Sequence, residues 1–205
     1  MSDRDYVLGT HDAEIERLGL QHRVWRPRAL AAWQRAGIAA GQTVIDLGAG
    51  PGYAALDLAE IVGSRGRVIA VERSRRFLDA LESMARGRGL ANITTVAADA
   101  VDAPFGEAVA DASWCRWVLS FVREPKAVVA HLARALKPGG VAVFQEYLDY
   151  SSWRLAPQSA PPPATSPTGT SNRGRSPFSR GGRSWSTWRG PSRLARLSAP
   201  ARPER

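Results

Sequence analysis

A glycine-rich segment after a short apolar run offers the clearest chemistry in the chain. Residues 46–52 read Asp-Leu-Gly-Ala-Gly-Pro-Gly and follow the β-branched residues 43–45. Glycines at such a turn let the backbone approach a ligand closely, and a helix that begins there points its N–H groups at it. A dinucleotide motif would need glycine where Tyr53 stands, and a P-loop would need Gly-Lys-Ser/Thr. The segment therefore indicates a ligand-binding turn of neither kind.

Two further acids stand where later strands are expected to end. Glu72 closes the apolar run at residues 67–71, and Asp99 follows the run at residues 92–97. Carboxylates accept hydrogen bonds from hydroxyl and amino groups, and each charge-assisted bond is worth about 1.5–3 kcal/mol. Two structural alternatives remain open: Glu72 could pair with a neighbouring arginine, and Asp99 could cap the segment that follows it.

The elements that position these residues alternate between strands and helices. Strands are predicted at residues 43–47, 67–71, 92–97, 111–115 and 141–145, and helices at residues 10–21, 27–37, 53–61, 74–87 and 125–136. Thr10 is the expected cap of the first helix, Pro27 the expected first residue of the second, and residues 137–140 an expected turn. The alternation predicts an α/β fold: a Rossmann-like, doubly wound, largely parallel sheet of about five strands, preceded by N-terminal helices.

Four motifs, in this order, resemble those of class I S-adenosylmethionine (SAM)-dependent methyltransferases. Residues 44–52 resemble the first motif, residues 68–72 the second strand with its terminal acid, residues 96–100 the third strand ending in Asp, and residues 136–141 the turn before the fifth strand. The resemblance spans about residues 6–153 and is to small-molecule members of the type that methylates ubiquinone and menaquinone precursors at carbon.

The resemblance implies SAM as the cofactor and gives individual residues roles. Glu72 would accept from both ribose hydroxyls, Asp99 from the adenine amino group, Asp46 would orient the loop, and Arg116 would pair with the cofactor carboxylate. The expected cofactor-binding residues are Tyr6, Gln21, Asp46, Gly48, Ala49, Gly50, Gly52, Glu72, Arg73, Asp99, Ala100 and Arg116. The residues expected near the substrate are Trp117, Glu146 and Tyr147. No catalytic residue is identified, and the three histidines form no spaced set that predicts a metal site.

Composition divides the chain into two parts. Residues 1–155 are predicted to form the SAM-binding domain, with a helical lid at about residues 6–37. Residues 156–205 are rich in Arg, Ser, Pro and Gly and are expected to be disordered. The net charge of +9 lies wholly in residues 151–205, which hold ten arginines and one acid. Because this tail stands where the family has its last strands, it resembles a truncation or a reading-frame shift that leaves the fifth strand an unpaired edge. An evolved basic tail is the alternative.

The remaining features narrow the function classes. Cys115 is the single cysteine, the N-terminus lacks the apolar run of a signal peptide, and no apolar run is long enough to span a bilayer. We therefore expect a cytoplasmic protein. No Asn/Asp-Pro-Pro-aromatic tetrapeptide follows the fourth strand, so a small-molecule acceptor is favoured over a nucleic acid. Two alternatives stay open: an RNA or DNA methyltransferase that uses the basic tail, and a SAM-binding remnant without turnover. The sequence predicts neither the methylated atom nor the oligomeric state.

Overall fold

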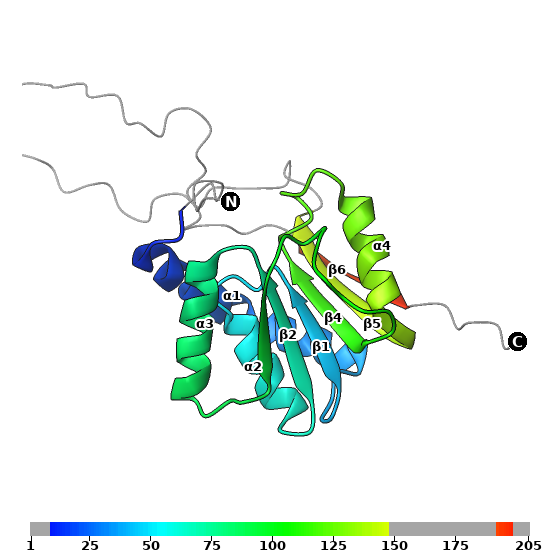
Figure 1. Cartoon of the computed structure of the whole chain (residues 1–205), viewed down its shortest axis with the longest axis horizontal. Helices are drawn as coiled ribbons and strands as arrows, with labels where there is room; N and C mark the ends of the chain where they lie inside the picture. Colours follow the sequence, from blue (N-terminus) through cyan, green and yellow to red (C-terminus); the bar gives the residue numbers. More distant parts are fainter. Residues whose placement is uncertain (1–8, 148–191, 199–205) are drawn as a thin grey trace, which may run out of the picture. The chain divides into compact units, whose positions relative to one another are not determined.

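The described strands form one sheet with helices packed against it (Figure 1). The structure is a computed structural model that describes residues 9–147 and 192–198. Its strands are β1 (Thr43–Leu47), β2 (Arg67–Glu72), β3 (Ile93–Ala97), β4 (Ala110–Arg116), β5 (Leu136–Tyr147) and β6 (Ser192–Ser198). They lie in the order β3-β2-β1-β4-β5-β6, and the four pairs among β1 to β5 are all parallel. The predicted Rossmann-like, largely parallel sheet is confirmed.

Helices cover both faces of the sheet because alternate strand residues point to opposite sides. The helices are α1 (Asp12–Ala36), α2 (Tyr53–Val62), α3 (Arg75–Gly87) and α4 (Pro125–Ala135). Val44 belongs to a core cluster with residues of α1, α2 and α3, whereas its neighbour Ile45 belongs to a second cluster with residues of α4. The parallel sheet is thus buried between two apolar layers. Among the described residues no helix is long and apolar enough to cross a membrane.

The segment before β1 is one helix, where two were expected. Helix α1 runs through Pro27 and ends at Ala36, and the next residue, Gly37, is its left-handed C-cap with a φ of 76°. Proline removes one backbone hydrogen bond and favours a break. Here the apolar face continues across it, with Trp25 before and Trp33 after it both buried, and this packing outweighs the local preference. The N-cap is His11 rather than Thr10, because Nδ1 of His11 accepts from the Glu14 amide at 3.2 Å.

Near the end of the sheet, the structure differs from two further expectations. Residues 137–140 were expected as a turn, but they lie inside β5, where the register with β4 shifts between Ala110 and Ala112 and Gly139 takes a φ of 80°. In the expected disordered tail, Ser192–Ser198 forms β6, which neighbours β5 and so covers the edge expected to be unpaired. The other tail residues lie outside the described part of the chain.

The strand register brings the chemically important residues to one edge. Leu47 pairs with Val71 on one side and Cys115 on the other, and Glu72 pairs with Ala97. The carboxyl ends of β1, β2, β3 and β4 therefore end side by side. In parallel α/β sheets this is the edge at which ligands bind, at the point where the strand order reverses. Here the reversal lies between β1 and β4.

Candidate functional site

The loop between β1 and α2 is built from glycines that carry left-handed backbone angles. Gly48, Gly50 and Gly52 have φ values of 69°, 55° and 90°, which L side chains rarely adopt. A Cβ at Gly48 would collide with Val118, and one at Gly52 would collide with Leu81. At Gly50, by contrast, a Cβ would meet no atom within 4 Å. The first and third glycines therefore allow close packing, and the middle one faces open space where a ligand could approach.

Glu72 connects the end of β2 to this loop. Its Oε2 accepts from the Gly50 amide at 3.0 Å and its Oε1 accepts from the Ser74 amide at 2.9 Å. The side chain is buried, and burial raises its pKa, although the backbone hydrogen bonds from Ser74, Gly50 and Arg73 oppose that rise. Because a carboxylate has about four acceptor positions, each oxygen can still accept a ligand hydroxyl. Glu72 therefore shapes the loop and keeps acceptor positions beside it.

The arginines after Glu72 form other contacts. Arg75 donates to Asp79 and Glu82, both at 2.8 Å, and Arg76 donates to Asp12 at 2.7 Å. Neither pairs with Glu72, so for these two the structural alternative to ligand binding is wrong. Arg73, predicted near the cofactor, is adjacent to Glu72, and its charge lowers the Glu72 pKa as a minor contribution.

Asp46 is a buried acid at the end of β1. Only 2% of it is exposed, and its Oδ2 has no hydrogen-bond partner among the described residues. Burial raises its pKa to about 7, with the Arg116 charge acting to lower it and the Glu72 charge to raise it further. A buried carboxylate oxygen without a donor is costly. Asp46 therefore has the capacity to accept a hydrogen bond from a bound ligand.

Asp99 lies beyond β3, at the same edge as Glu72. Its Oδ1 accepts from the Val101 amide at 3.1 Å, so the alternative of a local cap is present in the structure. That bond occupies one acceptor position of the carboxylate and leaves others for an amino group. Ala100 is partly buried against the α4-side cluster. The adenine-binding role of Asp99 stays a prediction.

Arg116 ends β4 and lies beside the rings of Trp117 and His22. Its guanidinium carbon is 5.1 Å from the centre of the Trp117 ring, and Nη2 is 3.2 Å from Nδ1 of His22 on α1. The Trp117 ring in turn packs edge-on against Trp25 of α1, with 5.5 Å between the ring centres. Helix α1 therefore covers the carboxyl end of β4.

Two expected site residues make contacts within the protein. Glu146, expected to face the substrate, accepts from the amides of Val118 and Leu119 at 2.9 and 3.0 Å and from Ser120 Oγ at 3.3 Å. Its carboxylate thus holds the loop after β4. Gln21 on α1 accepts from Arg17 at 3.4 Å, within its own helix.

Two other expected residues cannot be placed. Tyr6 lies outside the described residues, and the side chain of Tyr147 does as well.

Sequence analysis missed Asp57 altogether. It lies within the apolar run of α2, where it is buried and accepts from His22 and from Arg26 at 3.0 and 2.7 Å. The signal available was an acid flanked by Leu56 and Leu58, because a charged residue inside a buried helix needs partners. Within the described residues no group of three or more His, Cys, Asp or Glu is placed to hold a metal ion.

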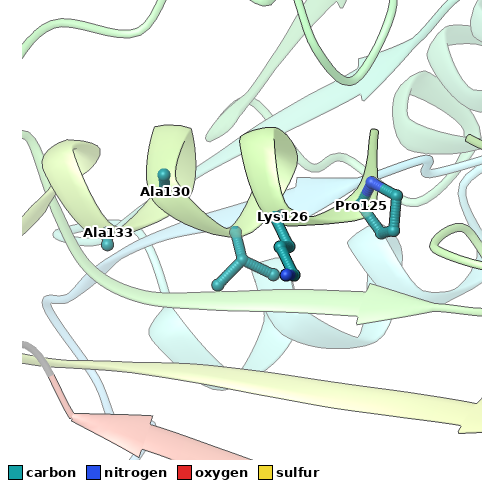
Figure 2. Close-up of a pocket in the computed structure, with 5 residues that line it drawn as sticks. Pro125, Lys126, Ala130 and Ala133 are labelled. Atoms are coloured by element: carbon teal, nitrogen blue, oxygen red, sulfur yellow. The ribbon is translucent and has the colours of Figure 1, made fainter. Parts of the chain in front are cut away.

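A separate hollow of about 350 Å³ lies along α4 (Figure 2). It is lined by Pro125, Lys126, Val129, Ala130 and Ala133. Helix α4 packs on the face of the sheet opposite to α1, and none of the residues at the glycine loop lines this hollow. It is therefore distinct from the candidate site.

Comparison with known proteins identifies the family of the chain. Residues 45–144 match a family described as a methyltransferase domain. A 2-phytyl-1,4-naphtoquinone methyltransferase from Nostoc sp. is 32% identical over 161 residues, which cover 74% of this chain and 69% of the relative. A ubiquinone/menaquinone biosynthesis C-methyltransferase from Francisella tularensis subsp. novicida is 29% identical over 127 residues, covering 62% of this chain and 50% of the relative. The chain spans about half the length of some relatives, including 55% of a Synechococcus elongatus enzyme.

A solved structure agrees on the fold. A SAM-dependent methyltransferase from Aquifex aeolicus has a TM-score of 0.55 at 21% identity, covering 66% of this chain and 69% of that one. The sheet order and the glycine loop define a Rossmann-like methyltransferase domain. The chain belongs to the class I SAM-dependent methyltransferase family.

Proposed function

We propose that this chain binds SAM and transfers its methyl group to a quinone-type small molecule. The observation that carries the proposal is the contact between Glu72 and the Gly50 amide, which places a buried carboxylate with spare acceptor positions beside an open glycine turn. Similarity to quinone methyltransferases supports the substrate class. The single cysteine, buried and free, supports a cytoplasmic site of action as part of the same proposal.

The residues present fit SAM. Gly50 leaves room for close approach, Glu72 would accept from the ribose hydroxyls, and Asp99 would accept from the adenine amino group. The unsatisfied Oδ2 of Asp46 and the guanidinium of Arg116 would face the methionine end. The hydroxyl and amino groups of SAM need hydrogen-bond acceptors, which the carboxylates of Glu72 and Asp99 would supply. The carboxylate of SAM needs a cation, which Arg116 would supply.

The chemistry of the proposed reaction makes few demands on the protein. SAM supplies an electrophilic methyl group on a sulfonium. A reduced quinone is electron-rich, so a ring carbon can form the new C–C bond while its ring proton leaves and the sulfonium becomes a thioether. Holding two reactants in line can lower the barrier by roughly 7–11 kcal/mol, so no dedicated base is needed. The edge-on pair of Trp25 and Trp117 would keep water from this end of the site.

Titration calorimetry and a methyl-transfer assay test the proposal. The full chain should bind SAM and should transfer a labelled methyl group to 2-phytyl-1,4-naphthoquinone supplied in its reduced form. The oxidised quinone and a tRNA mixture serve as alternative acceptors in matched reactions. Failure to bind SAM would overturn the whole proposal. Binding with transfer only to RNA would overturn the small-molecule acceptor.

Replacing Glu72 tests the cofactor assignment. Glu72→Ala should weaken SAM binding by about 10-fold to 150-fold, or roughly 1.5–3 kcal/mol, because charge-assisted hydrogen bonds to the ribose are lost. Glu72→Gln keeps one acceptor oxygen for the loop and should lose less. Glu82→Ala is the matched control, since Glu82 forms a surface ion pair with Arg75. Unchanged SAM affinity in a folded Glu72→Ala protein would remove Glu72 from the site.

A further inference from the structure

A buried polar chain joins three elements beneath the candidate site. His22 of α1 lies with Nε2 at 3.0 Å from Oδ2 of Asp57 on α2 and with Nδ1 at 3.2 Å from Nη2 of Arg116 on β4. The side chains of His22 and Asp57 are only 5% and 7% exposed. Because both ring nitrogens of the buried His22 make polar contacts, the ring is held in one orientation.

The two contacts also determine which nitrogen carries the proton. A guanidinium can only donate, so Nδ1 of His22 accepts from Arg116. The proton of the neutral ring is then on Nε2 and is donated to Asp57. Burial acts to raise the Asp57 pKa, but hydrogen bonds from His22 and Arg26 outweigh it, and the pKa of Asp57 is lowered overall. Asp57 is therefore a charged acceptor that selects the Nε2–H tautomer.

The surroundings of the ring support a single arrangement. Tyr53 of α2 stacks on His22 with 5.9 Å between ring centres and 22° between planes, and its hydroxyl donates to the Ile15 carbonyl of α1 at 3.1 Å. Arg26 donates to the same Asp57 oxygen at 2.7 Å. Helices α1 and α2 are thus locked together around His22, and the ring presents its one acceptor nitrogen to Arg116.

Arg116 lies near the start of the glycine loop. It ends β4, next to the end of β1 in the sheet, and its charge acts on the buried Asp46 carboxylate. Its planar guanidinium packs on the Trp117 ring, which controls its tilt. The bond to His22 controls its rotation in that plane. A guanidinium fixed in this way can meet a carboxylate with little further loss of side-chain entropy.

We propose that His22 is a positioning residue: as the Nε2–H tautomer selected by Asp57, it orients the Arg116 guanidinium to receive the carboxylate of SAM. This inference rests on the proposed function, because it needs SAM as the ligand. It assigns to α1, which precedes the matched methyltransferase domain, a direct part in cofactor affinity. Asp57 acts one step further away, through His22.

Comparing two forms of the cofactor distinguishes a positioning role of His22 from a purely structural role. Titration calorimetry of the full chain compares SAM with decarboxylated SAM, which keeps the sulfonium, ribose and adenine but lacks the carboxylate. His22→Gln keeps an N–H near the position of Nε2 for Asp57 but removes the acceptor facing Arg116. It should weaken SAM binding about 3-fold to 10-fold, the size of one ordinary hydrogen bond, because His22 acts on SAM only through Arg116, and it should leave decarboxylated SAM within 2-fold.

A second substitution at His22 should preserve the SAM affinity that the first one lowers. His22→Asn places a carbonyl oxygen close to the position of Nδ1 and should retain most of the SAM affinity. His131→Gln makes the same change as the first variant on α4, where His131 contacts the Ala103 carbonyl, and should not affect either ligand. Nitrogen-15 spectra of the unaltered protein should show the His22 ring with its proton on Nε2.

The outcomes that overturn the inference are separable from failure of the proposed function. No SAM binding by the unaltered chain overturns both. Normal SAM binding, together with equal losses for SAM and decarboxylated SAM in His22→Gln, shows a structural role and overturns only the inference. A His22 ring with its proton on Nδ1 overturns it as well, whatever the affinities.

Discussion

A Gly50→Val protein is expected to bind SAM at least about 100-fold more weakly than the unaltered chain while remaining folded. The φ of Gly50 is 55°, a region that costs an L residue roughly 1–2 kcal/mol and a β-branched one more. The added side chain would project into the open space beside the loop, where no protein atom lies within 4 Å. It would therefore occupy the position of the ligand. Titration calorimetry with SAM, alongside thermal unfolding, measures both effects.

Gly89→Val is the matched control for this prediction. Gly89 has a φ of 67°, and a Cβ there also meets no atom within 4 Å, but it follows α3, away from the glycine loop. The two substitutions should lower stability by similar amounts, and only the one at Gly50 should reduce SAM affinity. Equal SAM affinity in the two variants would mean that the glycine loop is not the cofactor site.

The strands and the glycine loop could be predicted because local signals and tertiary structure agree there. Residues 43–47 are mostly apolar and are followed by glycines, and a buried parallel strand followed by a tight turn satisfies both features. The same holds for β2 and its terminal Glu72. Its contact with the Gly50 amide could not be predicted, since it depends on the lateral spacing of two strands rather than on either sequence alone.

Elsewhere local signals were overruled by packing. Pro27 indicates a helix start, yet the buried tryptophans on either side keep α1 continuous. Glycine and proline at residues 137–140 indicate a turn, yet they lie within β5, where the register with β4 shifts. In both places the tertiary contacts are between residues far apart in sequence. Periodicity within a short window cannot detect them.

The candidate site shows the same limit for polar residues. Glu146 has the residue type and the strand-end position of a substrate-binding acid, but it holds the loop after β4 through two amides. His22 gave only a weak signal, since a lone histidine on a helix is more often a surface or core residue. Its importance follows from Asp57 and Arg116, which are 35 and 94 positions away.

The stability of the protein is expected to fall as the pH rises from about 4 to about 7, because of Asp46. Burial raises the folded-state pKa of Asp46 from 3.8 to about 7. Between these values the folded state binds a proton that the unfolded state has released, so the free energy of unfolding decreases with pH. A difference of about three pKa units corresponds to as much as about 4 kcal/mol. Denaturant unfolding at a series of pH values measures this change.

Asp46→Asn isolates the contribution of that one carboxyl group. The amide is similar in size and does not titrate, so the variant should lack the Asp46 part of the decline and should exceed the unaltered protein in stability at pH 7. Glu72 and Glu146 also have raised pKa values and will produce a decline in both proteins, so the difference between the two curves is the informative quantity. Asp57 and Asp111 have lowered pKa values, and the stability they contribute is lost only as the pH falls below about 4. A difference curve that is flat from pH 4 to pH 7 would show that Asp46 is charged throughout, and the buried oxygen would then need a donor that the described residues do not supply.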